Sequence, residues 1–430
     1  MKRFLFSLFI SLTVFSTAFA QSEAQSFDVD GIKVIFKPTS KNVVNIRVYY
    51  RGGVSNYPAD KEGIENLTLD AVTKGGTKNY SAKAFKDSAD KYDILMYGQS
   101  TYDYGYIQIN CISKYFNKGW ELFSEAITDP AFDSNEVELL KRKIIIAGKE
   151  RESSPDIRLQ EVLMRGAFKN TPYTAKPEGS EETLSKLTTD DLKKYYQTLL
   201  NKNRLFIVVV GRLTKEELVE KIISSFGNIS SQPYSAEDYK DPVWNDNKIT
   251  TEQSELPINY ISAVLNAPGM TNIDYVPFQI GISGLAGNIY QTLRRDLNLS
   301  YSQGADLVNL RMPYVKIYAT TKRPLEAMQA MVATLKRIQS YGVDDEWLTH
   351  LKNIYLTRSY IEDQSASEIC SSLGHAEVMG GWQYAEDLPQ LVKMATVEQV
   401  NRALNFYIVG LRWNYLGNTQ AVEGAKLPIY

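Results

Sequence analysis

The chain has 430 residues, of which 43% are hydrophobic, 23% charged and 11% aromatic. This composition is typical of globular domains and excludes a disordered, collagen-like or disulfide-rich protein. The 48 basic and 50 acidic side chains nearly balance, so no excess charge indicates binding to nucleic acid or to an anionic membrane surface. At roughly 150 residues per domain, we expect two or three domains.

The first 20 residues have the pattern of a cleavable signal peptide. Lys2 and Arg3 precede the apolar run 4–15, and Ala18-Phe19-Ala20 follows it. Such a basic start, short apolar core and small-residue ending predict export, with cleavage after Ala20. A membrane anchor needs about 20 apolar residues, and serines and threonines interrupt this run. We expect a periplasmic or secreted protein without membrane insertion.

Phe27–Phe36, Val43–Tyr50 and Tyr102–Ile112 alternate as strands do, and Ser134–Glu152 has helical spacing. Leu205–Gly211 is a continuous apolar run, typical of a strand buried on both faces. Mixed strands and helices predict the α+β class, with helices packed on an antiparallel or mixed sheet.

A helix start followed by a strand occurs twice. Thr188 to Leu192 precedes the strand 205–211, and Thr396 to Val400 precedes the strand 412–418. The recurrence suggests duplication of a domain of about 200 residues, although two common units can coincide. We therefore predict domains at 21–228 and 257–430, joined by a polar linker at 229–256.

Cysteine and histidine are scarce. Cys111 and Cys370 lie one in each half, so we expect no disulfide framework, and whether they meet stays open. His350 and His375 are the only histidines, so a zinc site built on two or three histidines is almost excluded. We expect both as surface or capping residues.

Several short motifs, in order, resemble the insulinase/pitrilysin-like zinc peptidases, the inverzincin family. They are Arg51-Gly52-Gly53, Gly63-Ile64, Gly75-Gly76-Thr77, Asp129-Pro130-Ala131-Phe132, Thr171-Pro172-Tyr173, Pro177-Glu178-Gly179, Leu293-Arg294 and Leu297–Tyr301. The resemblance covers most of the chain after the signal peptide. It implies two homologous α/β-layered domains of the kind found in the metalloenzyme LuxS and the processing peptidases, forming half of a clam shell.

The metal motif of that family, His-x-x-Glu-His on a helix, is not matched. The corresponding positions are Asn66, Leu69 and Asp70. The histidines would bind zinc and the glutamate would activate water, which a leucine cannot do. The family's third ligand, a glutamate, corresponds to Ala147 or Gly148. The resemblance therefore implies no metal or other cofactor in this chain.

Polar residues remain on the same helix. Ile64, Leu67 and Ala71 belong to its predicted apolar face, while Asn66 and Asp70 project from the other. Asn66, Asp70 and Glu65 supply too few oxygens for a hard cation, which prefers six or more. An active enzyme with a metal on Asp70 and Glu65 is nevertheless one remaining alternative. The spacing gives serine or cysteine catalysis little support.

The second half keeps two other family residues, Arg294 and Tyr301. The resemblance implies that they contact the peptide substrate. Apolar residues at 285, 289 and 293 predict an inward stripe on the helix that carries Arg294, and Asn298 suits a left-handed helix end. The alternative is a solvated helix charge and a packed tyrosine. Asn288 stands where the family often has arginine.

The resemblance implies a non-catalytic, substrate-binding subunit of an exported zinc peptidase. Such a subunit would form a heterodimer with a homologue that carries the zinc motif, and the pair would cleave peptides. A peptide-binding or scaffold protein of the cell envelope without a peptidase partner is the alternative. Peptide specificity and oligomeric state stay open.

Overall fold

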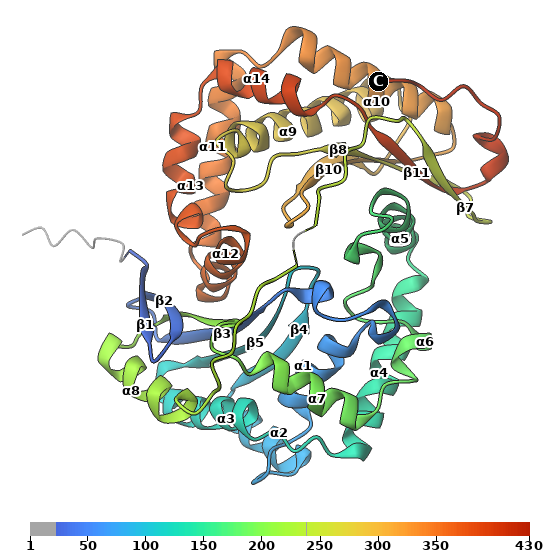
Figure 1. Cartoon of the computed structure of the whole chain (residues 1–430). Coiled ribbons are helices and arrows are strands. Elements are labelled where there is room, and N and C mark those ends of the chain that lie inside the picture. The colour runs from blue at the N-terminus through green and yellow to red at the C-terminus, as the bar shows by residue number, and fades with distance from the viewer. Residues whose placement is uncertain (1–22, 238) are drawn as a thin grey trace, which may run out of the picture.

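The computed structural model describes residues 23–237 and 239–430, which form two halves stacked one on the other (Figure 1). The elements of the first half are β1 (Gln25–Val29), β2 (Ile32–Pro38), β3 (Val43–Arg51), η1 (Gly53–Asn56), η2 (Ala59–Lys61), α1 (Ile64–Lys74), α2 (Ala82–Asp90), β4 (Leu95–Ser100), β5 (Tyr104–Ile112), η3 (Ser113–Tyr115), α3 (Phe116–Thr128), α4 (Ser134–Glu152), α5 (Pro155–Ala167), η4 (Pro172–Thr174), α6 (Glu181–Leu184), α7 (Thr189–Leu199), β6 (Leu205–Gly211) and α8 (Lys215–Phe226).

The second half follows a similar order. Its elements are β7 (Ile249–Gln253), β8 (Asn259–Asn266), α9 (Tyr275–Tyr290), η5 (Gln291–Asp296), β9 (Gln303–Val308), β10 (Tyr314–Thr321), α10 (Pro324–Tyr341), α11 (Asp345–Glu362), α12 (Ala366–Met379), α13 (Gln383–Met394), α14 (Val397–Tyr407), β11 (Arg412–Gly417) and η6 (Thr419–Ala421).

The two sheets have the same topology. Within the described residues, the first has the strand order β1-β2-β6-β3-β5-β4 and the second β7-β11-β8-β10-β9. β6 runs parallel to β2 and antiparallel to β3, and β11 runs parallel to β7 and antiparallel to β8. Apart from β1, each strand of the first sheet has its counterpart in the second. The α+β class and the two homologous layered domains are confirmed.

The helices before the two equivalent strands begin in the same way. The hydroxyls of Thr188 and Thr396 each accept a hydrogen bond from the backbone N–H of the third helical residue. The side chain of that third residue in turn accepts a hydrogen bond from the backbone N–H of the threonine. This reciprocal arrangement satisfies two N–H groups that a helix start leaves without partners. The predicted helix–strand repeat is therefore present, with α7–β6 matching α14–β11.

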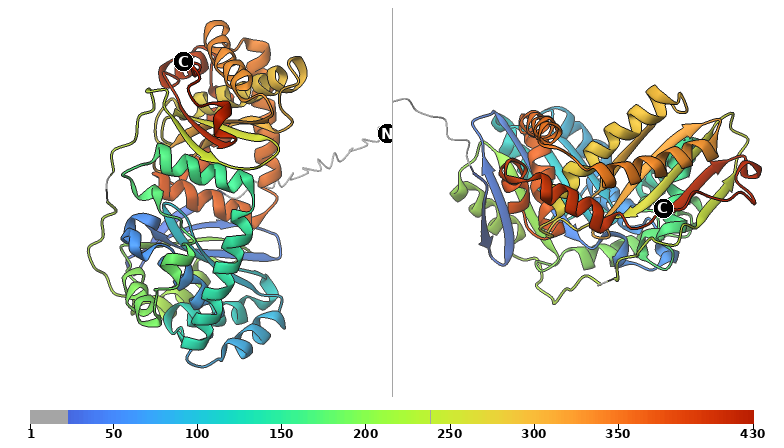
Figure 2. Two further views of the ribbon diagram at one scale, coloured as in Figure 1. Left: turned by 90° about the vertical axis from the view of Figure 1, so that its right-hand side faces the viewer. Right: turned by 90° about the horizontal axis from the view of Figure 1, so that it is seen from above.

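Each half contributes one helix that packs on the sheet of the other half. α5 packs on β7, β8 and β11, whereas α12 packs on β3 and β6. Figure 2 shows the two helices between the sheets, α5 against the upper sheet and α12 against the lower. Because α5 and α12 occupy corresponding places in their halves, the exchange is reciprocal, and each sheet face is covered by a helix from the other half.

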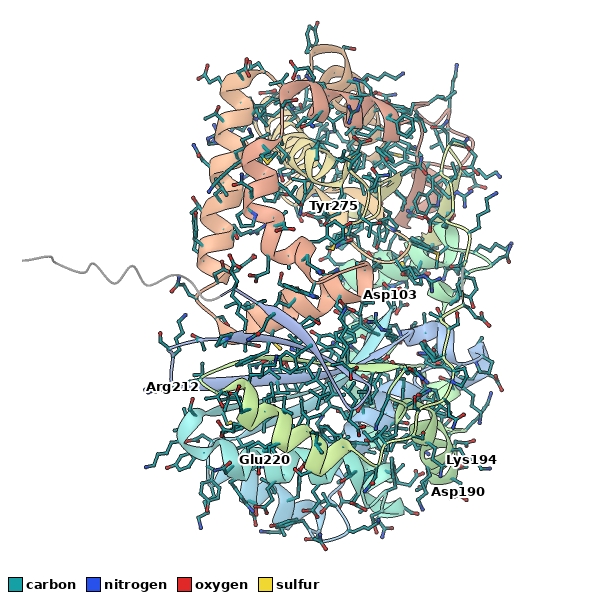
Figure 3. All side chains as sticks on the ribbon, turned by 60° about the vertical axis from the view of Figure 1, so that its left-hand side comes forward. Asp103, Asp190, Lys194, Arg212, Glu220 and Tyr275 are labelled. Carbon is teal, nitrogen blue, oxygen red and sulfur yellow. The ribbon has the colours of Figure 1, made fainter. Side chains whose placement is uncertain are left out.

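Polar contacts fix this exchange. Glu377 of α12 is 6% exposed and binds both Lys33 Nζ, at 2.8 Å, and Arg51 Nη2, at 2.7 Å. On the other side, Gln160 Nε2 of α5 donates to the Tyr314 hydroxyl at 2.9 Å. Asp103 lies at the junction of the halves (Figure 3), where its Oδ2 accepts a hydrogen bond from the backbone N–H of Arg311 at 3.0 Å.

The segment 229–256, predicted as a linker, contains structure that the sequence analysis did not anticipate. β7 lies within it, and the indole of Trp244 is buried, with Nε1 donating to the carbonyl of Ala167 at 3.0 Å. The reason is that β7 is an edge strand in which four of the five residues are polar and none is fully buried, so its composition resembles that of a loop.

Both cysteines are free and buried. Cys111 belongs to the core of the first half, and Cys370 lies where α12 meets the first sheet. Burial raises the pKa of Cys111 to about 11 and that of Cys370 to about 12, which makes both thiols unreactive. Among the described residues, no helix has the length and apolar character needed to cross a membrane. The predicted signal peptide, 1–20, lies outside those residues.

Candidate functional site

The helix that corresponds to the family's metal-binding helix is α1. Its N-cap is Gly63, with φ 86°, and its C-cap is Gly75. A Cβ on Gly63 would lie 2.6 Å from the Cα of Gly179, which itself has φ 82°. Only glycine allows this approach and this backbone. Two of the separate motifs in the sequence therefore meet at the start of α1.

The three degenerate motif positions all lie inside the first half. Leu69 is 0% exposed and packs against Gly98 and Gly105 of the sheet. Asn66 Oδ1 accepts a hydrogen bond from the backbone N–H of Ser100 at 3.3 Å. Asp70 forms an ion pair with Lys74, one turn further along. Burial raises the pKa of Asp70, and Lys74 partly opposes that rise.

Glu65 has become part of the core. It is 0% exposed and accepts hydrogen bonds from Ser100 Oγ, at 2.9 Å, and from the Tyr195 hydroxyl. Arg204 Nη2 lies 3.4 Å from its Oε2. Burial raises the pKa of Glu65, while Arg204 and then Tyr195 act in the opposite direction. Glu65 therefore serves as a buried anchor between α1, α7 and the start of β6.

The polar face of α1 is not open, because every residue from Ile64 to Thr73 is buried. The helix is enclosed by β4, β5, α3, α4 and α7. Glu65 and Asp70 also do not converge on one point, since five residues place them roughly 140° apart around the helix and each has separate partners. A metal held by this pair has no geometric support.

The position of the family's third ligand is open. On α4, Ala147 is exposed, and a Cβ on Gly148 would meet no atom within 4 Å. Glu150, the nearest acid in sequence, is exposed. Within the part of the chain that the structure describes, no three histidine, cysteine, aspartate or glutamate side chains are grouped so as to hold a metal ion. The residues present therefore do not fit a zinc ion.

Arg294 and Tyr301 lie together in the second half. The guanidinium of Arg294 sits 3.8 Å above the centre of the Tyr301 ring, and Tyr301 is 79% exposed. The helix carrying Arg294 widens into the π-helix η5, where the N–H of Leu297 donates to the carbonyl of Thr292 at 3.1 Å. Such widened turns occur often at functional sites.

The end of this helix agrees with the prediction. Asn298 is left-handed, with φ 49°, and Leu285, Ile289 and Leu293 are 0% exposed. Arg323 Nη2 donates to the carbonyls of Leu297 and Asn298, at 3.2 and 3.3 Å. These contacts hold the turn that brings the tyrosine back over the arginine.

One histidine differs from expectation. His350 is exposed on α11, but His375 is largely buried between the halves, where Asn309 Nδ2 lies 3.1 Å from its Nε2 and the Tyr104 hydroxyl 3.5 Å from its Nδ1. Burial lowers the pKa of His375. Sequence reasoning missed this role, and it missed Arg204 and Glu377, because all three depend on contacts between distant segments.

These features define a class of protein: a duplicated, two-domain peptidase-like chain whose metal-motif helix is retained as a structural element. Residues 33–179 match the family described as Insulinase (Peptidase family M16), and residues 186–355 match its companion, Peptidase M16 inactive domain. The chain belongs to this insulinase family, as a member that lacks the zinc-binding motif.

Curated relatives are distant in sequence. Subunit 1 of the mitochondrial cytochrome b-c1 complex from Bos taurus is 22% identical over 303 residues, which cover 70% of this chain and 60% of that protein. The chain therefore spans less than two thirds of this relative. A protein of Helicobacter pylori named "Non-peptidase homolog YmxG" is 22% identical over 354 residues, 79% of each chain.

Solved structures agree on the fold. The peptidase M16 inactive domain from Pseudomonas fluorescens matches with a TM-score of 0.83 and 17% identity, over 92% of this chain and 98% of that one. The periplasmic protease PqqL from Escherichia coli matches with a TM-score of 0.78 and 17% identity. That match covers 97% of this chain but 49% of PqqL, so this chain corresponds in fold to half of that protease.

Proposed function

We propose that this chain is the non-catalytic, substrate-binding subunit of an exported zinc peptidase, and that it pairs with a homologue carrying the zinc motif. The observation that carries the proposal is a contrast within the chain. The positions for metal and general base hold Asn66, Leu69 and Asp70, all buried, whereas the partly buried Arg294 stacks on the ring of Tyr301, which is exposed.

The likeness in fold to half of PqqL supports the pairing. This architecture accounts for 49% of the length of PqqL, which leaves room in that protease for a second unit of similar size, the place that we assign to the zinc-motif partner. PqqL is a periplasmic protease, which agrees with the export predicted from residues 1–20 of this chain. We propose the periplasm as the shared compartment.

We expect Arg294 and Tyr301 to position the peptide substrate. An arginine offers a planar fork of N–H donors to a peptide carbonyl or carboxylate, and a tyrosine adds a hydroxyl donor on a rigid ring. Held at the scissile bond, such donors orient the peptide and stabilise negative charge that develops on the carbonyl oxygen. Activation of water falls to the partner, because Leu69 can neither accept a proton nor orient a water molecule.

The test is reconstitution. The purified chain is mixed with a zinc-motif homologue, and cleavage of a fluorogenic peptide is followed with and without chelator. We expect neither zinc nor activity in this chain alone, and chelator-sensitive activity in the mixture. Arg294→Ala should lower turnover at least about tenfold, a loss of about 1.4 kcal/mol of transition-state stabilisation, without separating the chains on gel filtration.

The neighbouring Arg295→Ala is the matched control, since Arg295 likewise lies over a tyrosine, Tyr290, at 5.7 Å, and is exposed. It should leave turnover unchanged. Peptide cleavage by the isolated chain that stops on chelation would refute the proposal, as would equal losses in the two variants.

A second candidate is a binding or scaffold protein without a peptidase partner. The relatives named as a cytochrome b-c1 subunit and as a non-peptidase homologue favour it. Affinity purification from the native organism separates the two functions. A zinc-motif homologue among the bound proteins supports the first candidate, and recovery of non-peptidase proteins alone supports the second.

A further inference from the structure

Two long helices, one in each half, expose an apolar stripe. On α11, Ile354 and Ile361 are 50% and 67% exposed, and on α4, Leu139 and Ile146 are 38% and 58% exposed. Residues seven apart lie within about 20° of each other around a helix, so each pair forms one stripe that is open to solvent. Figure 1 shows the two helices on opposite sides of the molecule.

The stripe on α11 has the spacing of a helix-packing seam. The residues along it, at intervals of four, three and four, are His350, Ile354, Thr357 and Ile361. This is the pattern by which one helix packs along another. Asn353, Arg358 and Glu362 complete the lining of a groove of about 510 Å³ along the stripe. The groove therefore suits a helix, and its chemistry decides which helix.

A second copy of α11 is complementary to this groove. When two copies lie antiparallel about a two-fold axis near Thr357, Ile354 of each meets Ile361 of the other. A threonine hydroxyl both donates and accepts, so the two Thr357 side chains can bond each other at the axis. Arg358 lies 3.8 Å from Glu362 of its own chain, so the two copies place two cations and two carboxylates side by side. Each group along the seam thus meets an apolar, hydroxyl or opposite-charge counterpart.

The stripe on α4 is not complementary to itself. The exposed Arg142 and Lys143 stand between its two apolar residues, where α11 has one threonine and one arginine. Ala147 stands where α11 has Glu362. Two antiparallel copies of α4 would bring four cations together at the axis, and like charges repel. Of the two stripes, the one on α11 therefore fits a second copy of this chain.

We propose that two copies of this chain associate through α11, antiparallel about a two-fold axis near Thr357, with Ile354 and Ile361 as the apolar anchors. The contact goes beyond the proposed peptidase role and shares no residue with Arg294 and Tyr301. A helix of 18 residues is about 27 Å long. One such helix from each copy buries less than the roughly 1,200–2,000 Å² of stable interfaces, so we expect a weak, reversible dimer.

Sedimentation velocity of the full mature chain, between about 1 and about 200 µM, tests the association. We expect a reversible shift from monomer to dimer as the concentration rises. Ile354→Ser/Ile361→Ser should weaken the dimer at least about tenfold. Leu139→Ser/Ile146→Ser, the matched control on α4, should leave it unchanged. A chain that stays monomeric throughout overturns the proposal, even where the α11 variant disturbs pairing with a zinc-motif homologue, and so do equal losses in the two double variants.

Disulfide cross-linking tests the antiparallel arrangement. Thr357→Cys, at the axis, should join two copies under oxidised glutathione, since a disulfide needs Cα atoms within about 7 Å of each other. In His350→Cys the two copies of the variant residue lie about 21 Å apart along the helices and should stay unlinked. The native Cys111 and Cys370 are buried and give no background. Linking of both variants indicates a parallel pair, and linking of neither indicates a different surface; either result overturns the proposal.

Discussion

The helices α1 and α9 occupy equivalent places, each following a strand at the middle of its sheet. They differ in the burial of their polar side chains. In α1 the charge of Glu65 is buried against Arg204. The helix α9 is apolar along its buried face and continues into η5, where the partly buried Arg294 stacks on the exposed ring of Tyr301. Buried polar groups such as Glu65 contribute to stability, whereas the exposed ring of Tyr301 and the arginine beneath it stay available for contacts outside the chain, which is the basis of the proposed role.

The largest effect should come from breaking the anchor of α1. Arg204→Met leaves the Glu65 carboxylate buried without its cation, and loss of one partner of a buried ion pair costs about 3–5 kcal/mol of unfolding free energy. Urea titration followed by circular dichroism measures it.

Lys74→Met is the matched control on the same helix. It removes the cation that faces Asp70, but Lys74 is half exposed, with 47% of its side-chain surface accessible. Exposed pairs contribute about 0–1 kcal/mol. Equal losses in the two variants would contradict the assignment of Glu65 as the structural acid of α1.

The exchanged helices should respond unequally to added methyl groups. A Cβ on Gly374 of α12 would lie 2.1 Å from the ring of Tyr49, which is fully buried and stacked on Phe206. Gly374→Ala should therefore cost about 1–3 kcal/mol. A Cβ on Gly166 of α5 would lie 2.2 Å from Thr250 Oγ1 and 2.8 Å from Thr250 Cβ. Rotation of the hydroxyl relieves only the first contact, but Thr250 is half-buried on the edge strand β7, which can shift outward, so we expect a smaller loss of about 1 kcal/mol.

Gly287→Ala is the control for both, because it lies in α9 with no atom within 4 Å of the added Cβ. There the better helix propensity of alanine should stabilise the protein by about 0.5–1 kcal/mol. Urea midpoints compare the three. A neutral Gly374→Ala would mean that α12 does not sit on the first sheet as described.

A smaller effect depends on pH. Burial lowers the pKa of His375 below its ordinary value of 6.5. Below pH 6.5 the unfolded chain binds a proton that the folded chain does not, so His375 lowers stability as the pH falls through that value, by at most about 1.4 kcal/mol per pH unit. His375→Gln should flatten this part of the stability profile. His350→Gln, at the exposed histidine, should leave it unchanged, and the reverse result would place the titrating group elsewhere.

Local features were predictable from the sequence, and contacts between halves were not. The strand 205–211, the helix 134–152 and the left-handed Asn298 agree with prediction because apolar runs, helical spacing and cap residues act over a few positions. The partner of Glu65 lies 139 residues away, and no periodicity reports such a pair. The exchange of α5 and α12, and the burial of His375 that follows from it, require the assembled sheets.

For the same reason, the degenerate motif was easier to recognise than to interpret. The sequence shows that a leucine replaces the general base, but not that α1 is enclosed on every side. Only the packing around Asn66 and Asp70 distinguishes an accessible site that lacks its metal from a site that is closed by the protein's own side chains. The structure favours the second description, since residues 64–73 are all buried.

The smallest expected effect concerns the contribution of Arg294 and Tyr301 to the unfolding free energy. Its size decides between a binding role and a packing role for the two residues. Because Tyr301 is 79% exposed, its stacking with Arg294 should contribute only about 0.5–1 kcal/mol. A double-mutant cycle of Arg294→Ala and Tyr301→Ala in urea measures this coupling. Single losses above about 2 kcal/mol would show that the residues are needed to hold the end of η5, and their surface position would then no longer indicate binding. Losses near zero, combined with reduced turnover in the reconstituted complex, would separate the two roles, since a residue that stabilises nothing in the free chain can affect turnover only through what the complex binds.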